Sequence, residues 1–165
     1  GLTTSEVGFV YGTVGIASLM AGGLLGGYLI SQQGLRFWLW PMVVIMHSPD
    51  LIFVYLSYAQ PESNYLISSA VAIEQFGYGF GFTAYMLYMI MVVEGEHKTA
   101  HFAICTRFMA MGMMFPGMWS GWLQDTIGYR HFFLWVVLST IPGFLVAALV
   151  KIDPQFGRKK TETAK

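Results

Sequence analysis

The sequence predicts an all-α integral membrane protein with five transmembrane helices. Hydrophobic residues make up 55% of the 165 residues and charged residues only 11%, whereas soluble domains carry about 25% charged residues. The mean hydropathy is +0.56. Apolar stretches also recur along the chain, each reaching the roughly 20 residues that a helix needs to cross the hydrocarbon core of a bilayer.

The five predicted helices are separated by short polar linkers, so each is expected to run antiparallel to the one before. Their bounds are about 8–30, 37–58, 65–93, 99–123 and 132–150. Together they form a predicted transmembrane bundle over residues 1–152. The charged tail over residues 153–165 is predicted to be disordered. Because the first residue is Gly1 rather than Met, a preceding segment is expected to be missing.

The distribution of positive charge predicts the orientation. Five crossings place the two termini on opposite sides of the membrane. One side carries Arg36, Lys98, Lys151, Arg158, Lys159, Lys160 and Lys165, and the other side carries Arg130. Cytoplasmic loops carry the excess of Lys and Arg, so the C-terminus is predicted to be cytoplasmic and the N-terminus external.

Glycines and prolines indicate how the helices pack. The first helix carries a stripe of small residues at Gly8, Gly12, Gly15, Gly22 and Gly26. Such stripes let helix backbones approach closely in a membrane, and they also suit faces that slide during a transport cycle. Prolines at 49, 116 and 142 predict bends in three further helices.

Glu74 is the leading candidate for a functional residue. It lies about 13 Å into the third helix at 1.5 Å per residue, near the middle of a core about 30 Å thick. Steps of four and three residues place Tyr78, Tyr85 and Tyr88 on the same face. That face suits a polar cavity that binds a hydroxylated solute. The alternative is a structural Glu74 that pairs with another helix.

Two other ionisable residues are candidates because charge at membrane depth is costly, about 2.5–3.5 kcal/mol at the helix centre. Arg107 lies at a depth from which it could pair with Glu74, or its side chain could extend to the cytoplasmic interface. Asp50 is one turn from His47, so the two could share a proton, and a structural pair is the favoured alternative.

The sequence predicts no enzyme, metal site, cofactor or nucleic-acid partner. No nucleophile elbow, zinc-protease motif, Cys-x-x-Cys pair or phosphate-binding loop occurs. A membrane-embedded enzyme would need Glu74, Asp50, His47 and the tyrosines to meet within hydrogen-bond reach. His97 and His101 have a spacing that metal sites use, but a solvated loop explains them better. The single Cys105 excludes an intrachain disulfide.

A set of motifs recurs in order across the last three predicted helices. They are AIEQFGYGFGFTAY over 72–85, HFAI over 101–104, Gly112, Pro116-Gly117, Gly121-Trp122, Gly128 before Phe132-Phe133, and Pro142-Gly143. With these motifs the chain resembles the C-terminal half of major facilitator superfamily transporters. Within that superfamily it is most similar to the AmpG-type muropeptide permeases and the related acetyl-CoA transporters.

The resemblance implies a fold and a function. The five helices would be the eighth to twelfth of a twelve-helix transporter, and so most of its C-terminal six-helix half. The protein would import an anhydro-sugar peptide from peptidoglycan recycling across a bacterial inner membrane, by proton symport and alternating access. Its partners would be the solute, protons, the bilayer and the missing N-terminal half. The resemblance implies a proton pathway or substrate contact that includes Glu74.

An alternative from a different class is a non-transport membrane module, such as a sensor or an assembly subunit with five helices. The two hypotheses differ in what precedes the chain: the transporter predicts about seven further helices, by the twelve-helix count of the resemblance, and the module predicts none.

Overall fold

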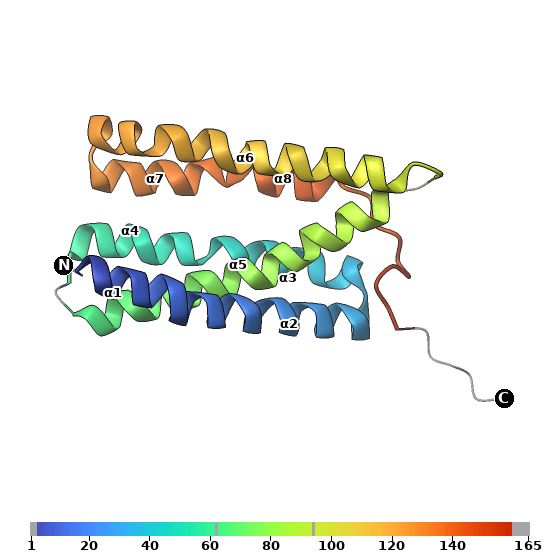
Figure 1. Cartoon of the computed structure of the whole chain (residues 1–165), viewed down its shortest axis with the longest axis horizontal. Helices are drawn as coiled ribbons and strands as arrows, with labels where there is room; N and C mark the ends of the chain where they lie inside the picture. The colour runs from blue at the N-terminus through green and yellow to red at the C-terminus, as the bar shows by residue number, and fades with distance from the viewer. Residues whose placement is uncertain (1–2, 62, 94, 160–165) are drawn as a thin grey trace.

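The computed structural model describes residues 3–61, 63–93 and 95–159, which are helical apart from short connections and a C-terminal segment (Figure 1). The helices are α1 (Thr4–Phe9), the π-helical η1 (Val10–Gly15), α2 (Ile16–Gln33), α3 (Leu35–His47), α4 (Pro49–Ala59), α5 (Asn64–Val92), α6 (Lys98–Ile127), α7 (Tyr129–Ser139) and α8 (Ile141–Leu149). No strand occurs in these three ranges, so the predicted all-α class is confirmed.

Several consecutive helices join end to end, and each such group forms one long helical rod. Three such rods are long and apolar enough to cross a membrane, Thr4–Gln33, Leu35–Ala59 and Tyr129–Leu149. Helices α5 and α6 have 29 and 30 residues and are long enough to cross a membrane, but they are not among these three apolar spans. A multi-pass membrane protein is therefore supported, while five crossings remain a proposal.

Prolines interrupt two of the rods. Pro49 begins α4 directly after the break at Ser48, and Pro142 lies at the start of α8 after the break at Thr140. Proline cannot donate a helical hydrogen bond, so the carbonyl of Ile45 accepts one from the Ser48 hydroxyl at 3.2 Å instead. Pro116, by contrast, lies inside α6, which continues through that residue as one helix.

The tightest packing joins α2, α3 and α5, and small residues make it possible. A Cβ added at Gly22 would overlap the carbonyl oxygen of Phe76, and one added at Gly79 would overlap that of Leu19. At one end of these helices a small apolar core forms. Its buried members are Ile30, Leu35, Met42, Phe80 and Ala84.

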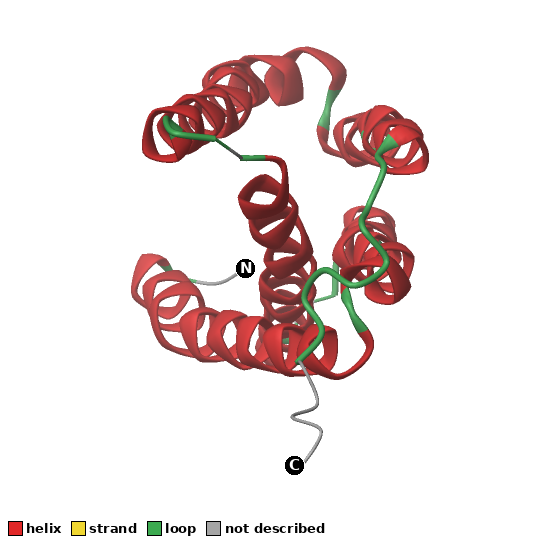
Figure 2. Cartoon of the chain, turned by 90° about the vertical axis from the view of Figure 1, so that its right-hand side faces the viewer, coloured by secondary structure: helices red, strands yellow, loops and turns green. Residues whose placement is uncertain are grey.

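The helices α6, α7 and α8 are attached more loosely. None of them contains a buried residue. Figure 2 shows the resulting open arrangement, in which the helices follow a curve around α5 rather than closing into a complete bundle. Large apolar side chains on α6 remain exposed, among them Phe108, Trp119 and Trp122. In a membrane such a surface is covered by lipid or by further protein.

The segment after α8 belongs to the tail over 153–165 that the sequence predicts to be disordered. Residues 153–159 fold back on the corner between α2 and α3. Phe156 packs against the apolar core, and its carbonyl accepts a hydrogen bond of 3.1 Å from the Leu35 amide. The Lys159 amide donates to the Ser31 carbonyl at 2.8 Å, and Arg158 Nε donates to that of Gln33 at 3.0 Å. Residues 160–165 of the predicted tail lie outside the described residues.

Candidate functional site

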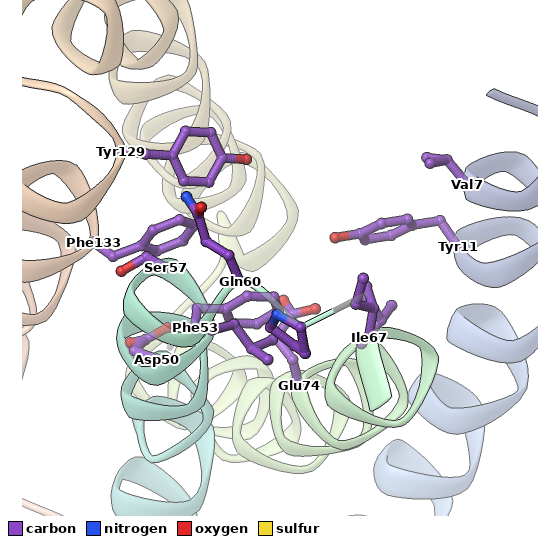
Figure 3. Close-up of a pocket in the computed structure, with 13 residues that line it drawn as sticks. Val7, Tyr11, Asp50, Phe53, Ser57, Gln60, Ile67, Glu74, Tyr129 and Phe133 are labelled. Carbon is purple, nitrogen blue, oxygen red and sulfur yellow. The ribbon is translucent and has the colours of Figure 1, made fainter. Parts of the chain in front are cut away.

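A pocket of about 560 Å³ lies at the end of the molecule that holds the N-terminus. It is formed between the first helical rod, α4, α5 and α7 (Figure 3). We call it the acidic pocket, because two carboxylates line it, Asp50 from α4 and Glu74 from α5. Its other lining residues are Val7, Tyr11, Phe53, Leu56, Ser57, Gln60, Pro61, Ile67, Val71, Tyr129 and Phe133.

Glu74 is half-buried on the face of α5 that turns toward this pocket. One of its oxygens accepts a hydrogen bond of 2.8 Å from the side-chain amide of Gln75. No Lys, Arg or His is among the described residues that line the acidic pocket. The Glu74 carboxylate therefore has no cationic partner among the lining residues of this pocket.

Asp50 brings a second titratable group to the same pocket. It stands in the first turn of α4, and its carboxylate oxygen lies 3.6 Å from Nδ1 of His47, the last residue of α3. The two side chains retain 23% and 28% of their accessible surface, so neither is sealed in the protein. The pair that sequence spacing allows is therefore formed, across the break at Ser48 and Pro49.

A second pocket of about 570 Å³ lies between α3, α5, α6 and α8. We call it the aromatic pocket, because Tyr78, Tyr85 and Tyr88 line it, together with the ring of His47. Its remaining surface is almost entirely apolar. It is completed by Leu39, Val43, Met46, Gly81, Phe82, Ala84, Met109, Met113, Pro142, Gly143, Val146, Ala147 and Val150.

The structure divides the single face that the sequence predicts on α5. Glu74 lines the acidic pocket, whereas the three tyrosines line the aromatic pocket. The residues do follow one another along one side of the helix. Different neighbours cover its two parts, however: α4 and α7 beside Glu74, and α3, α6 and α8 beside the tyrosines.

Arg107 is not brought to either pocket. It is exposed on α6, and no salt bridge joins it to Glu74 among the described residues. The possible pairing predicted from depth alone does not form, because α5 and α6 diverge from their common turn and make few contacts (Figure 1).

Sequence reasoning did not identify several polar residues of the acidic pocket. They are Tyr11, Ser57, Gln60 and Tyr129. Tyr11 lies in a glycine-rich stretch, and Gln60 and Tyr129 lie at helix ends, where polar residues are expected for other reasons. Only the tertiary arrangement of the rods directs these side chains to one place. Within the described residues no cluster of three His, Cys, Asp or Glu could hold a metal ion.

Comparison with known proteins confirms the resemblance stated from the motifs. An anhydromuropeptide permease of Escherichia coli strain K12 is 23% identical over 158 residues, which is 96% of this chain and 32% of the relative. The transporter AmpG 1 of Rickettsia felis is 22% identical over 151 residues, 92% of this chain and 33% of the relative. The transporter AmpG 2 of Rickettsia typhi is 22% identical over 148 residues, which is 88% of this chain and 36% of the relative.

The curated homologues of this chain are thus AmpG permeases, proteins named for transport rather than for a catalysed reaction. The chain spans about a third of the length of these relatives. No protein-family model matches the chain. No solved structure matches it significantly.

Proposed function

We propose that this chain forms most of the C-terminal half of a major facilitator transporter, which imports an anhydro-muropeptide together with protons. The observation that carries the proposal is the similarity to AmpG permeases over nearly the whole chain, joined to a pocket lined by two carboxylates. A membrane carboxylate is a functional-site hypothesis by default, because it is too costly to keep for packing alone.

Glu74 is the proposed coupling residue. In its charged form it holds the acidic pocket in a polar, hydrated state. Protonation removes the charge and with it the desolvation cost of enclosing the pocket. A transporter that rocks about a site near the bilayer midplane can then move only when this carboxyl group is neutral. Such a rule ties the conformational change to the proton.

The polar groups around Glu74 fit a sugar-peptide. Tyr11, Gln60 and Tyr129 provide hydroxyl and amide groups that can donate or accept hydrogen bonds, and Phe53 and Phe133 provide apolar ring faces. Ligand sites typically combine such apolar walls with a few placed polar groups. The tyrosines of the aromatic pocket extend the same chemistry along α5.

The proposed location is a bacterial inner membrane, with the C-terminus cytoplasmic. The turns that carry Arg36 and Lys98 lie at one end of the molecule with residues 151–159, and the turn that carries Arg130 lies at the other (Figure 1). This distribution fits the positive-inside rule. The exposed apolar surface of α6 fits a chain that needs the N-terminal half as its partner.

The test is proton-driven uptake of labelled anhydro-muropeptide by the full-length protein in vesicles, with Glu74 intact and with Glu74→Gln. The variant keeps the size and hydrogen-bonding capacity of the side chain but cannot titrate. We expect uptake to fall by about 10²-fold or more, the usual scale for loss of a proton-transfer group.

The matched control is Asp125→Asn, which removes an acid from an exposed position near the end of α6. Its uptake should equal that of the wild type at equal protein amount. Unchanged uptake in Glu74→Gln would make Glu74 a structural residue. Absence of uptake by the wild type would contradict the proposed substrate and coupling together.

A further inference from the structure

The acidic pocket and the aromatic pocket share no lining residue, yet one side-chain pair connects them. Asp50 lines the first pocket and His47 lines the second. The 3.6 Å between Asp50 Oδ2 and His47 Nδ1 is the link. No other ion pair or side-chain hydrogen bond joins the two sets of lining residues within the described part of the chain.

The position of the pair suits a connection across the membrane. The rod Leu35–Ala59 has 25 residues, and α3 supplies the first 13, ending at His47. His47 is therefore at the middle of the rod. The acidic pocket extends from this level toward the N-terminal end of the molecule, and the aromatic pocket extends toward the other end.

The imidazole is oriented so that its two nitrogens face different pockets. Nδ1 faces Asp50, while Nε2 points to α8, 3.8 Å from where a Cβ of Gly143 would stand. Gly143 belongs to the lining of the aromatic pocket. The ring also packs on Phe144, with centroids 5.4 Å apart. A histidine held in this way can accept a proton at one nitrogen and release one from the other.

The groups that face the pair determine what can compete for the proton. His47 contacts Asp50 from α4. In the aromatic pocket it lies with three tyrosines of α5, Tyr78, Tyr85 and Tyr88. The remaining neighbours carry no charge: Met109 and Met113 from α6, and Gly143 and Phe144 from α8. Asp50 shares the acidic pocket with the titratable residues Glu74 from α5, Tyr11 from η1 and Tyr129 from α7. No Lys or Arg occurs among the described lining residues of either pocket, so no fixed positive charge opposes a proton there.

We propose that His47 is a proton-relay residue that carries the coupling proton from Asp50 in the acidic pocket to the aromatic pocket. The inference rests on the proposed function, since it concerns the route of the transported proton. A proton taken up by the Asp50 carboxylate passes to Nδ1 of the neutral ring, and Nε2 loses its own proton to the aromatic pocket. Asp50 returns to the carboxylate. Exchange of the ring proton from Nδ1 to Nε2 through water, once the side chain has turned away from Asp50, restores the starting tautomer.

The transfer needs a shorter contact than the resting structure has. Proton transfer takes place at about 2.6–3.2 Å, or through one bridging water. The break between α3 and α4 provides the adjustment, because His47 and Asp50 belong to different helices and Pro49 between them donates no helical hydrogen bond. Movement at this break would open and close the relay.

The experiment uses the full-length protein in proteoliposomes and compares two modes of transport of labelled anhydro-muropeptide. The first is accumulation driven by an imposed pH gradient. The second is exchange of internal for external substrate without a gradient, which needs binding and conformational change but no net proton movement. For His47→Gln we expect accumulation to fall by about 10²-fold, while exchange stays close to that of the wild type, because exchange needs no net proton movement.

Two further variants sharpen the result. His101→Gln replaces an exposed histidine of α6 that lines neither pocket, and it should leave both modes unchanged. Asp50→Asn should also lose accumulation. Combining Asp50→Asn with His47→Gln should cost no more than either change alone, because residues that act in one path are not additive.

The outcomes separate the relay from the proposed function. Selective loss of accumulation in His47→Gln supports the relay. Unchanged accumulation overturns the relay and leaves the proton-coupled transporter standing. Loss of both modes also overturns it, since His47 would then serve binding or folding. A wild type that shows neither accumulation nor exchange contradicts the proposed function, and the relay fails with it.

Discussion

The two parts of this bundle are held together by different means. In the first part, α2, α3 and α5 approach so closely that glycines such as Gly22 and Gly79 have no room for a methyl group. The second part, α6 to α8, has no buried residue, and its helix α7 touches α4 through aromatic side chains. Phe53 stacks on Phe133 with centroids 5.8 Å apart, and Arg130 lies 5.3 Å over the ring of Tyr58.

The difference explains where the pockets are. Backbone contact through glycine leaves no space between helices, whereas contact through long aromatic side chains holds helices apart. Both the acidic and the aromatic pocket lie at the junction of the two parts, with residues from each among their lining. A rigid part and a loosely attached part are also what a rocking mechanism needs at a substrate site.

The largest expected effect tests the glycine packing. Gly79→Leu places a side chain against the backbone of Leu19, where even a Cβ would overlap. We expect this change to destabilise the chain by at least about 3 kcal/mol, which is the upper end of the usual range for overpacked sites. Gly117→Leu is the matched change in α6, where a Cβ meets nothing within 4 Å. It should leave the unfolding temperature in detergent almost unchanged. Equal effects of the two changes would contradict the division into a tight and a loose part.

A smaller effect is expected where the C-terminal segment joins the tight part. Phe156→Ala removes a ring that packs on the core of Ile30, Leu35 and Met42. Because Phe156 is only partly buried, we expect a loss of about 2 kcal/mol, below the 3–5 kcal/mol of fully buried sites. Phe108→Ala on α6 removes a ring that is 68% exposed and should cost less than about 0.5 kcal/mol. Thermal unfolding of both variants in the same detergent measures the contrast.

The smallest effect concerns a polar atom inside the tight part. The indole nitrogen of Trp38 is buried and has no hydrogen-bond partner among the described residues. Trp38→Phe removes an unpaired donor, which offsets the loss of ring volume, so stability should change by less than about 1 kcal/mol. Trp135→Phe on the exposed surface of α7 is the control. A loss of several kcal/mol in Trp38→Phe would show that the nitrogen is hydrogen-bonded after all.

Much of the fold could be predicted from local patterns. Composition and apolar run length predict helices of membrane length, because a bilayer core sets that length. Pro49 and Pro142 were predicted to bend their helices, and each stands at a helix break, since proline removes a backbone donor wherever it occurs. The family resemblance was likewise present in the order of the motifs. Pro116, by contrast, lies inside the continuous helix α6.

The candidate site could be predicted only in part. Periodicity correctly places Glu74, Tyr78 and Tyr85 on one side of α5, because 3.6 residues per turn is a property of the single helix. Periodicity contains no information about which neighbouring helix covers each part of that side. The crossing of α5 with its neighbours assigns Glu74 to one pocket and the tyrosines to another. The same crossing leaves Arg107 outside both.

The sequence by itself therefore determined the all-helical class, the apolar composition of a membrane protein and the one-turn spacing that allows His47 to pair with Asp50. The tertiary structure alone decided that Asp50 shares a pocket with Glu74, and that His47 lines a different one. It also decided that Phe156 of the charged tail packs in the core. The physical reason is that these contacts join residues far apart in the chain, and their geometry depends on how whole helices cross.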